Sequence, residues 1–201
     1  PCFAIHKGIV NQAIAGEVAD GPWTSAYNQV MEEGFQNKIS VRKGDGLEVL
    51  APGEADCITI AGMGGTLISS ILERGKEKLV GTKRLVLQPN IQAINIRKWL
   101  HSNDWDLIAE TILEEDGKIY EILVAEKGNG KAAYSEKKES ELLLGPFLMK
   151  ECSDVFRKKW QAELKHWKHI IEQLEKSGKT ESSQEKQEQL KRNIAIVEEA
   201  L

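Results

Sequence analysis

The side chains best suited to nucleotide binding lie where predicted strands end. Glu17 closes an apolar stretch that begins at Ala13, and Val18 follows it. A carboxylate in this position accepts hydrogen bonds from ribose hydroxyl groups in nucleotide-binding folds, although a solvated loop acid is the simpler alternative. Asp45, next to Gly46, can accept a hydrogen bond from an adenine amino group or can form an ordinary Asp-Gly turn.

A glycine-rich corner follows the next apolar stretch. Residues 57–61 form a near-continuous apolar run, typical of a strand buried on both faces, and Gly62, Met63, Gly64 and Gly65 come directly after it. Because glycine lacks a Cβ, such a backbone can adopt positive φ or approach a ligand closely. We expect the edge of a cofactor here; the alternative is a tight strand-to-helix turn that requires small residues.

Two amide side chains, Gln88 and Asn90, flank Pro89 at the end of the following predicted strand. Amide groups at this edge can hydrogen-bond to a nucleobase. Alternatively, Asn90 caps the helix that follows. Glu121, on the last predicted strand, gives only a weak signal.

The spacing of the remaining reactive side chains indicates neither a metal site nor a nucleophilic triad. His166 and His169 fall on the wet side of a predicted helix, so we expect them to be exposed rather than metal ligands. The cysteines, Cys2, Cys57 and Cys152, are scattered and odd in number, which favours buried thiols in a reducing cytosol. The longest apolar runs are far too short to span a bilayer. We predict a cytoplasmic protein without a metal.

The elements that position these residues alternate between strands and helices. Strands are predicted over residues 13–18, 38–42, 57–61 and 84–88. Helices are predicted over residues 22–33, from Leu67 up to Gly75, and over 91–103, where Ile91, Ile94, Trp99 and Leu100 are expected to face inward. The fold class predicted from this alternation is α/β.

Two extended runs, residues 105–114 and 118–126, follow these units and are joined by an Asp-Gly turn. This pattern predicts a β-hairpin. A parallel α/β sheet that ends in an antiparallel pair is typical of methyltransferase-like sheets rather than of dehydrogenase sheets.

The chain divides near Gly130 into two predicted domains, residues 1–130 and residues 131–201. Residues 128–130 and 135–141 are interpreted as a linker. Apolar residues then recur in steps of three and four on two predicted helices separated by residues 177–183, which predicts an antiparallel coiled-coil hairpin. These apolar residues are Trp160, Leu164, Trp167, Ile171, Leu174, Leu190, Ile194, Val197 and Leu201.

The charges are unevenly distributed along the chain, whose net charge is −4. Residues 1–130 contain 13 Lys and Arg against 18 Asp and Glu, whereas residues 131–201 contain 14 against 13. The basic side chains of the tail can neutralise phosphates or can simply keep the helices soluble. The candidates for contacts with nucleic acid are Arg157, Lys158, Lys159, Lys165 and Lys168.

Five motifs, in this order, resemble the bacterial tRNA adenine-22 N1-methyltransferase family. They are Ala15-Gly16-Glu17, Arg42-Lys43-Gly44-Asp45-Gly46, Ile60-Ala61-Gly62-Met63-Gly64-Gly65, Leu87-Gln88-Pro89-Asn90 and Glu115-Asp116-Gly117-Lys118-Ile119-Tyr120-Glu121. The resemblance covers nearly the whole chain. It implies a class I, Rossmann-like domain that uses S-adenosylmethionine, followed by a helical hairpin that helps to hold tRNA.

The resemblance also implies roles for individual residues. Glu17, beside Val18, would hold the cofactor ribose; Asp45 and Gly46 would hold the cofactor adenine; Gly62, Met63 and Gly64 would form the pocket wall nearest the methyl group. For the target base we predict positioning by Gln88 and Asn90. The five basic residues of the tail would contact tRNA.

The chain departs from the family pattern at its start. Ahead of the segment that matches Pro1 to Ala4, family members have a first strand and a glycine-bearing loop that wraps the methionine part of the cofactor. That strand is central in the sheet, so its loss is expected to expose apolar flanks of the strands at Ala13 and Cys57. We therefore expect this chain to be a fragment that is inactive by itself.

Two other functions remain open. A nicotinamide-dependent oxidoreductase would share Glu17 and the Rossmann pattern, but the terminal hairpin and the lack of a hydride-transfer acid disfavour it. A non-catalytic RNA-binding or scaffold protein would explain the tail. The predicted partners are S-adenosylmethionine and tRNA, without a membrane; the oligomeric state is left open, with a monomer favoured.

Overall fold

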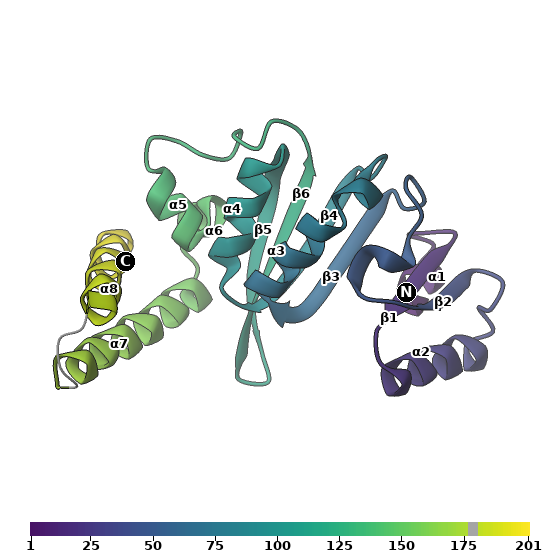
Figure 1. Cartoon of the computed structure of the whole chain (residues 1–201), viewed down its shortest axis with the longest axis horizontal. Coiled ribbons are helices and arrows are strands. Elements are labelled where there is room, and N and C mark those ends of the chain that lie inside the picture. The colour runs from purple at the N-terminus through teal and green to yellow at the C-terminus, as the bar shows by residue number, and fades with distance from the viewer. Residues whose placement is uncertain (177–180) are drawn as a thin grey trace. The chain divides into compact units, whose positions relative to one another are not determined.

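The structure is a computed structural model that describes residues 1–176 and 181–201 (Figure 1). The chain forms two compact units. The N-terminal unit comprises Pro1–Asp56 and Ser70–Thr82, and the C-terminal unit comprises Cys57–Ser69 and Lys83–Leu201. Helix α3, Gly65–Arg74, therefore begins in one unit and ends in the other. The functional division at residue 130 stays a prediction.

The N-terminal unit contains two parallel strands, as the sequence predicts. β1, Ala13–Glu17, pairs with β2, Ile39–Lys43, and Glu17 lies opposite Lys43 at the end of this register. Helix α2, Asp20–Glu32, makes the crossover that parallel strands require. The short helix α1, Cys2–His6, precedes β1.

One apolar cluster of this unit is centred on three side chains. Ile5, Val30 and Ile39 are almost fully buried against one another, with half-buried side chains such as Phe35 packed around them. Two short 3-10 helices complete the unit: η1, Gly46–Val49, and η2, Lys76–Leu79.

The C-terminal unit contains a four-stranded sheet in the order β3-β4-β6-β5. β3 is parallel to β4, whereas β6 is antiparallel to both β4 and β5. This confirms the predicted change from parallel to antiparallel pairing. The strands are β3, Cys57–Gly64; β4, Arg84–Ile91; β5, Trp105–Glu115; and β6, Lys118–Lys127.

The hairpin turn between β5 and β6 is also confirmed. Glu115 pairs with Lys118, so only Asp116 and Gly117 form the loop, with φ values of 50° and 72°. Two central residues with positive φ match the twist of the flanking strands, and Asp-Gly is a preferred pair for this geometry.

Helices pack on this sheet and extend beyond it. α4, Ala93–Ser102, contacts β5, and the chain then forms four more helices in the described region: α5, Lys138–Leu144; α6, Pro146–Glu151; α7, Asp154–Lys176; and α8, Glu181–Ala200. A tail cluster of buried apolar side chains joins them, consisting of Leu143, Leu144, Leu148, Phe156, Trp160 and Val197. Among the residues described, no helix has the length and apolar character needed to cross a membrane.

The prediction that the strand at residues 57–61 is buried on both faces is wrong. Ile58 and Ile60 are buried, but Cys57, Thr59 and Ala61 are exposed. Strand side chains alternate between the two faces of a sheet, so the two buried isoleucines share one face and the three exposed residues share the other. The strand also continues past Ala61 to Gly64 instead of ending at the glycine corner.

The next strand and helix also differ from the prediction. β4 passes through Pro89 and ends at Ile91, which is 65% exposed rather than turned inward. The ladder between β4 and β6 ends at Leu87, so the missing N–H of Pro89 breaks no bond to β6. Asn90 does not cap the following helix, because the N-cap residue of α4 is Gln92.

Three smaller expectations are corrected. Residues 138–141, interpreted as linker, form the first turn of α5, the helix that carries Leu143 and Leu144 of the tail cluster. The thiols are not buried: Cys57 is exposed, and Cys2 and Cys152 are half-buried. The predicted break between the last two helices falls partly on residues 177–180, outside the described residues, and residues 181–183 already belong to α8.

Candidate active site

Three groups at the carboxyl ends of β3 and β4 form a closed set of hydrogen bonds, which we call the amide cluster: Gly62, Gln88 and Asn90. The Gly62 N–H donates to Gln88 Oε1 over 2.9 Å, and Asn90 Nδ2 donates to the Gly62 carbonyl over 2.9 Å. Gln88 Nε2 donates to Asn90 Oδ1 over 3.2 Å. The two predicted amides thus hold both backbone groups of the predicted glycine.

The backbone of Gly62 explains this arrangement. Its φ is +78°, and the β3–β4 register shifts between Ala61 and Met63, so Gly62 bulges out of the ladder. A residue that leaves a ladder loses its strand partners, and the two amides replace them. A Cβ at Gly62 would meet no atom within 4 Å, which leaves open space beside the backbone.

A second set of polar contacts, missed from the sequence, joins the turns that follow the two strands. Asn95 Nδ2 donates to Thr66 Oγ1 over 2.7 Å, and the Thr66 hydroxyl donates to Gln92 Oε1 over 2.8 Å. Gln92 has φ 60° and ψ 43°, and a Cβ at Gly65 would lie 2.1 Å from the Gln92 carbonyl oxygen. Gly65 is therefore required for this close approach, and the two turns are fixed together.

In the N-terminal unit, Glu17 lies at the end of β1. Its carbonyl accepts a hydrogen bond from the Gly44 N–H over 3.0 Å, and its side chain is half-buried. Val18, directly after it, is 64% exposed. These two residues are therefore accessible from solvent, as a ligand contact requires.

Asp45 caps the short helix η1 and forms a reciprocal capping box with Glu48. Its carboxylate also accepts a hydrogen bond from Arg74 Nη1 over 3.0 Å. Gly46 has φ +59°, and a Cβ there would lie 2.7 Å from Ile71 Cγ2, so this position requires glycine. The nearby cavity of about 160 Å³, lined partly by Asp45 and Arg74, is too small for a complete nucleoside cofactor.

An ion pair links Arg42, on β2, to Glu54. Arg42 donates through both terminal nitrogens to the Glu54 carboxylate, at 2.7 and 2.6 Å, and also to the Val49 carbonyl at 2.8 Å. The hydrogen bonds from Arg42 lower the pKa of Glu54 to about 2. Glu54 therefore stays ionised well into the acid range.

Four of the five basic tail residues already have protein partners. Arg157 donates to the Leu201 carbonyl over 2.9 Å, Lys158 pairs with Glu114 at 2.6 Å and Lys168 with Glu198 at 2.7 Å. Lys159 pairs with the buried Glu121. Lys165 is exposed and has no ion pair among the residues described; it lines a shallow depression together with Lys168 and His169. His166 and His169 are exposed, as predicted.

Comparison with known proteins identifies the family. The model of the tRNA (adenine(22)-N(1))-methyltransferase family matches residues 1–199. The chain belongs to this family. The tRNA (adenine(22)-N(1))-methyltransferase of Bacillus subtilis (strain 168) is 52% identical over the whole chain, which spans 85% of that protein. The resemblance inferred from the five motifs is therefore confirmed.

Solved structures of similar proteins agree with this family. The crystal structure of the B. subtilis m1A22 tRNA methyltransferase superposes with a TM-score of 0.93 at 51% identity, and the alignment covers all of this chain and 86% of that one. The Streptococcus pneumoniae protein Sp1610, solved in complex with S-adenosyl-L-methionine, gives a TM-score of 0.86 at 40% identity, with 100% and 86% covered. The Rossmann-like methyltransferase fold predicted for the family is thus confirmed, and the oxidoreductase and scaffold alternatives lose their support.

Proposed function

We propose that this chain transfers the methyl group of S-adenosylmethionine to N1 of adenosine 22 in tRNA. The observation that carries the proposal is the family match over residues 1–199. A 40% identical protein solved with S-adenosylmethionine supports the choice of cofactor. A cytoplasmic location remains our prediction, and the oligomeric state stays open, with a monomer favoured.

The residues of the chain suit this cofactor. Glu17 offers a carboxylate to the two ribose hydroxyls, and Asp45, next to Gly46, offers one to the adenine amino group. Gly62 has open space where a side chain would be, and Met63 beside it is 37% exposed. By resemblance to the family, Gly62, Met63 and Gly64 would border the methyl group. When bound, S-adenosylmethionine supplies an electrophilic methyl group on a positively charged sulfur.

The chain's own contribution to the reaction is orientation. Adenine N1 carries a free lone pair and needs no base to remove a proton before it attacks the methyl carbon. Alignment of the two reactants and stabilisation of the charge that develops on the adenine ring are the main requirements. In a tRNA stem the base must also be turned out of its stack to reach the site.

Gln88 and Asn90 are our candidates for holding the target base. Each side-chain NH₂ group donates one hydrogen to the amide cluster and keeps a second hydrogen available. Asn90 is exposed and Gln88 is half-buried, so both amides can meet a base that enters from solvent. The remaining hydrogens can therefore orient the base while the others fix Gly62.

For the tail we propose a coiled-coil hairpin of α7 and α8 that contacts tRNA. Supporting contacts pair residues in antiparallel order: Arg157 with Leu201, Lys168 with Glu198 and Glu175 with Gln187. Lys165 is the best placed of the five basic candidates to reach a phosphate, since it is exposed and unpaired within the described region. Arg157, Lys158, Lys159 and Lys168 would have to exchange a protein partner for a phosphate.

The test is methyl transfer by the natural protein that contains this chain. It is incubated with labelled S-adenosylmethionine and an unmodified tRNA that carries adenosine at position 22, and the nucleosides are then analysed. We expect labelled 1-methyladenosine, and no label when that adenosine is replaced by guanosine. Cofactor binding without methyl transfer to either tRNA would refute the proposed function and leave only the fold.

A further inference from the structure

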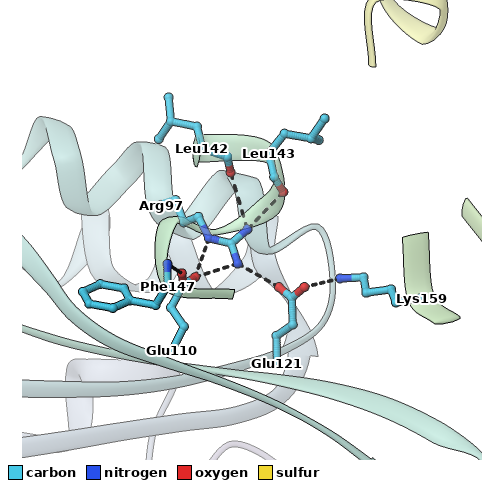
Figure 2. Close-up of polar contacts among 7 residues, drawn as sticks. All are labelled: Arg97, Glu110, Glu121, Leu142, Leu143, Phe147 and Lys159. Carbon is cyan, nitrogen blue, oxygen red and sulfur yellow. Dashed lines mark hydrogen bonds and ion pairs between the residues drawn. The ribbon is translucent and has the colours of Figure 1, made fainter. Parts of the chain in front are cut away.

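Four charged residues form a buried ionic cluster in the C-terminal unit: Arg97, Glu110, Glu121 and Lys159 (Figure 2). Arg97 is fully buried, and the side chains of Glu110 and Glu121 are 1% and 4% exposed. Arg97 Nε donates to Glu110 over 2.7 Å, and Nη2 donates to Glu121 over 3.0 Å. Lys159 donates to the other oxygen of Glu121.

The ionic cluster joins parts of the chain that are far apart in sequence. Arg97 lies on α4, the two glutamates on β5 and β6, and Lys159 on the second turn of α7. Arg97 Nη1 also donates to the Leu143 carbonyl over 3.1 Å, and Glu110 accepts a hydrogen bond from the Phe147 N–H over 3.1 Å (Figure 2). The cluster therefore ties α5, α6 and α7 to the sheet.

The cluster contains two acidic and two basic side chains, and the pKa of each carboxyl is set by burial acting against the nearby cations. Burial alone would raise the pKa of Glu121, but Arg97 and Lys159 outweigh burial and lower it. Burial raises the pKa of Glu110, because Arg97 offsets it only in part. The ionised form of Glu121 thus depends on both cations, Arg97 and Lys159. Of these two cations, Lys159 is the one that comes from the tail.

Apolar contacts alone do not fix the direction of α7. The tail cluster attaches α7 through Phe156 and Trp160, but apolar burial is nondirectional and tolerates small rotations. A hydrogen-bonded ion pair has a defined geometry, and buried ion pairs can therefore specify one arrangement rather than add stability. The Lys159 side chain is 25% exposed, so its removal would leave Glu121 paired with Arg97.

We propose that Lys159 and Glu121 are positioning residues for the tRNA substrate. By fixing the direction in which α7 leaves the sheet, they set the distance between tRNA bound along α7 and the amide cluster at the ends of β3 and β4. The inference rests on the proposed function, since it assigns the tail to tRNA. It gives Lys159 a role inside the protein instead of the phosphate contact predicted from its charge.

The two roles for Lys159 predict different kinetics. Misplacement of a bound substrate by about 1 Å can reduce the rate by as much as about a hundredfold without weakening its binding. Loss of a phosphate contact weakens binding and lowers the slope of log affinity against log salt by about 1. Lys159→Met is therefore expected to lower kcat at saturating tRNA about tenfold or more, with the tRNA Kd, its salt slope and the S-adenosylmethionine Kd unchanged.

Three variants complete the test. Lys159→Arg, which restores a donor to Glu121, should recover most of kcat. Glu121→Gln leaves Lys159 in place and should lower kcat as Lys159→Met does. Lys165→Met, an exposed lysine on the same helix, should instead raise the tRNA Kd and reduce the salt slope. Thermal unfolding of every variant, with assays well below its midpoint, separates positioning from loss of the fold.

The outcomes are distinct. A raised tRNA Kd with a smaller salt slope in Lys159→Met, together with normal kcat in Glu121→Gln, would overturn the positioning role and make Lys159 a phosphate ligand. Normal kinetics in both variants would also overturn it. If wild-type protein fails to methylate the tRNA that carries adenosine 22, the proposed function itself fails, which the wild-type assay reveals before any variant is compared.

Discussion

The amide cluster and the ionic cluster both tie distant segments of the C-terminal unit together, but they differ in charge and burial. The amide cluster, Gly62, Gln88 and Asn90, is neutral, and none of its three residues is fully buried. The ionic cluster contains four charges, and Arg97 at its centre is completely buried. Solvent therefore reaches one and is excluded from most of the other.

This difference means that the amide cluster can bind a substrate, whereas the ionic cluster holds parts of the protein together. Accessible amides retain hydrogen atoms that a substrate can use, and the cost of rearranging them is small because water can replace a lost partner. Arg97 uses its donors on two carboxylates and on backbone carbonyls of α5, so a substrate finds nothing to bind there. An unpaired charge in the same place would be very costly.

The strongest way to break the ionic cluster is Arg97→Met. It removes the Arg97 hydrogen bonds to two buried carboxylates and to the α5 carbonyls, so that Glu110 keeps only the Phe147 N–H as a partner and Glu121 only Lys159. We therefore expect a loss of about 3–5 kcal/mol in the free energy of unfolding. Arg84→Met is the matched control, since the Arg84 side chain is 52% exposed and pairs with Glu126 on the surface. It should cost less than about 1 kcal/mol. Urea unfolding measures both, and equal losses would contradict the distinction.

A substitution at a glycine tests the close packing around Arg97. Gly145 has φ +92°, and a Cβ there would lie 2.6 Å from Arg97 Nη2 and 2.7 Å from Glu110. Gly145→Ala should therefore cost about 2–4 kcal/mol from combined backbone strain and overpacking. Gly117→Ala is the control: its φ of +72° gives the same kind of strain, but a Cβ there meets no atom within 4 Å. A larger loss at Gly117 than at Gly145 in thermal unfolding would disprove this account.

Substitutions in the amide cluster should lower activity and leave stability nearly unchanged, in contrast to the loss of stability expected for Arg97→Met and Gly145→Ala. For Asn90→Ala we expect methyl transfer to fall about tenfold or more, as for loss of one oriented hydrogen-bond donor, with a change in unfolding free energy below about 1 kcal/mol. The S-adenosylmethionine Kd should stay close to that of the wild type. Gln88→Ala tests the second amide in the same assay. Unchanged turnover in both variants would remove these residues from the site.

Lowering the pH should also distinguish the two clusters, and its effect on the free energy of unfolding is the smallest of those predicted. The folded-state pKa of Glu121 is lowered from 4.5, so the stability that its ionised form contributes is present above about pH 4.5 and is lost as pH falls through the folded pKa. The stability difference between wild type and Glu121→Gln should thus be constant from pH 7 to pH 5 and shrink below pH 4.5. The difference between wild type and Asn90→Ala should not change, because no amide titrates. A constant difference for Glu121→Gln would contradict the lowered pKa.

Local sequence patterns determined most of the elements. Apolar runs located β1, β2, β4 and both strands of the hairpin, and Asp116 and Gly117 specified their turn because this pair adopts positive φ readily. Strand ends also marked Glu17 and Gln88 as candidates for the site. Such features depend on neighbours in the chain, so the sequence carries them directly.

The ionic cluster could have been suspected, but not assembled, from the sequence. Glu121, Leu123 and Ala125 occupy every second position of β6 and share its buried face. Arg97 shares the buried side of α4 with Ile96 and Leu100. Those periodicities place two charges among apolar residues. They do not say which partner each charge meets, because Glu121 lies far along the chain from both Arg97 and Lys159.

The sequence by itself determined the family, the order of the elements and the polar residues at strand ends. Only the tertiary structure decided that Gln88 and Asn90 fix the backbone of Gly62, that one face of β3 is exposed, and that Lys159 serves a buried carboxylate. The physical reason is the range of the interactions. Turns and strand or helix periodicity arise from bonds between near neighbours, whereas a hydrogen-bond partner or a buried charge is defined by segments that meet only when the chain has folded.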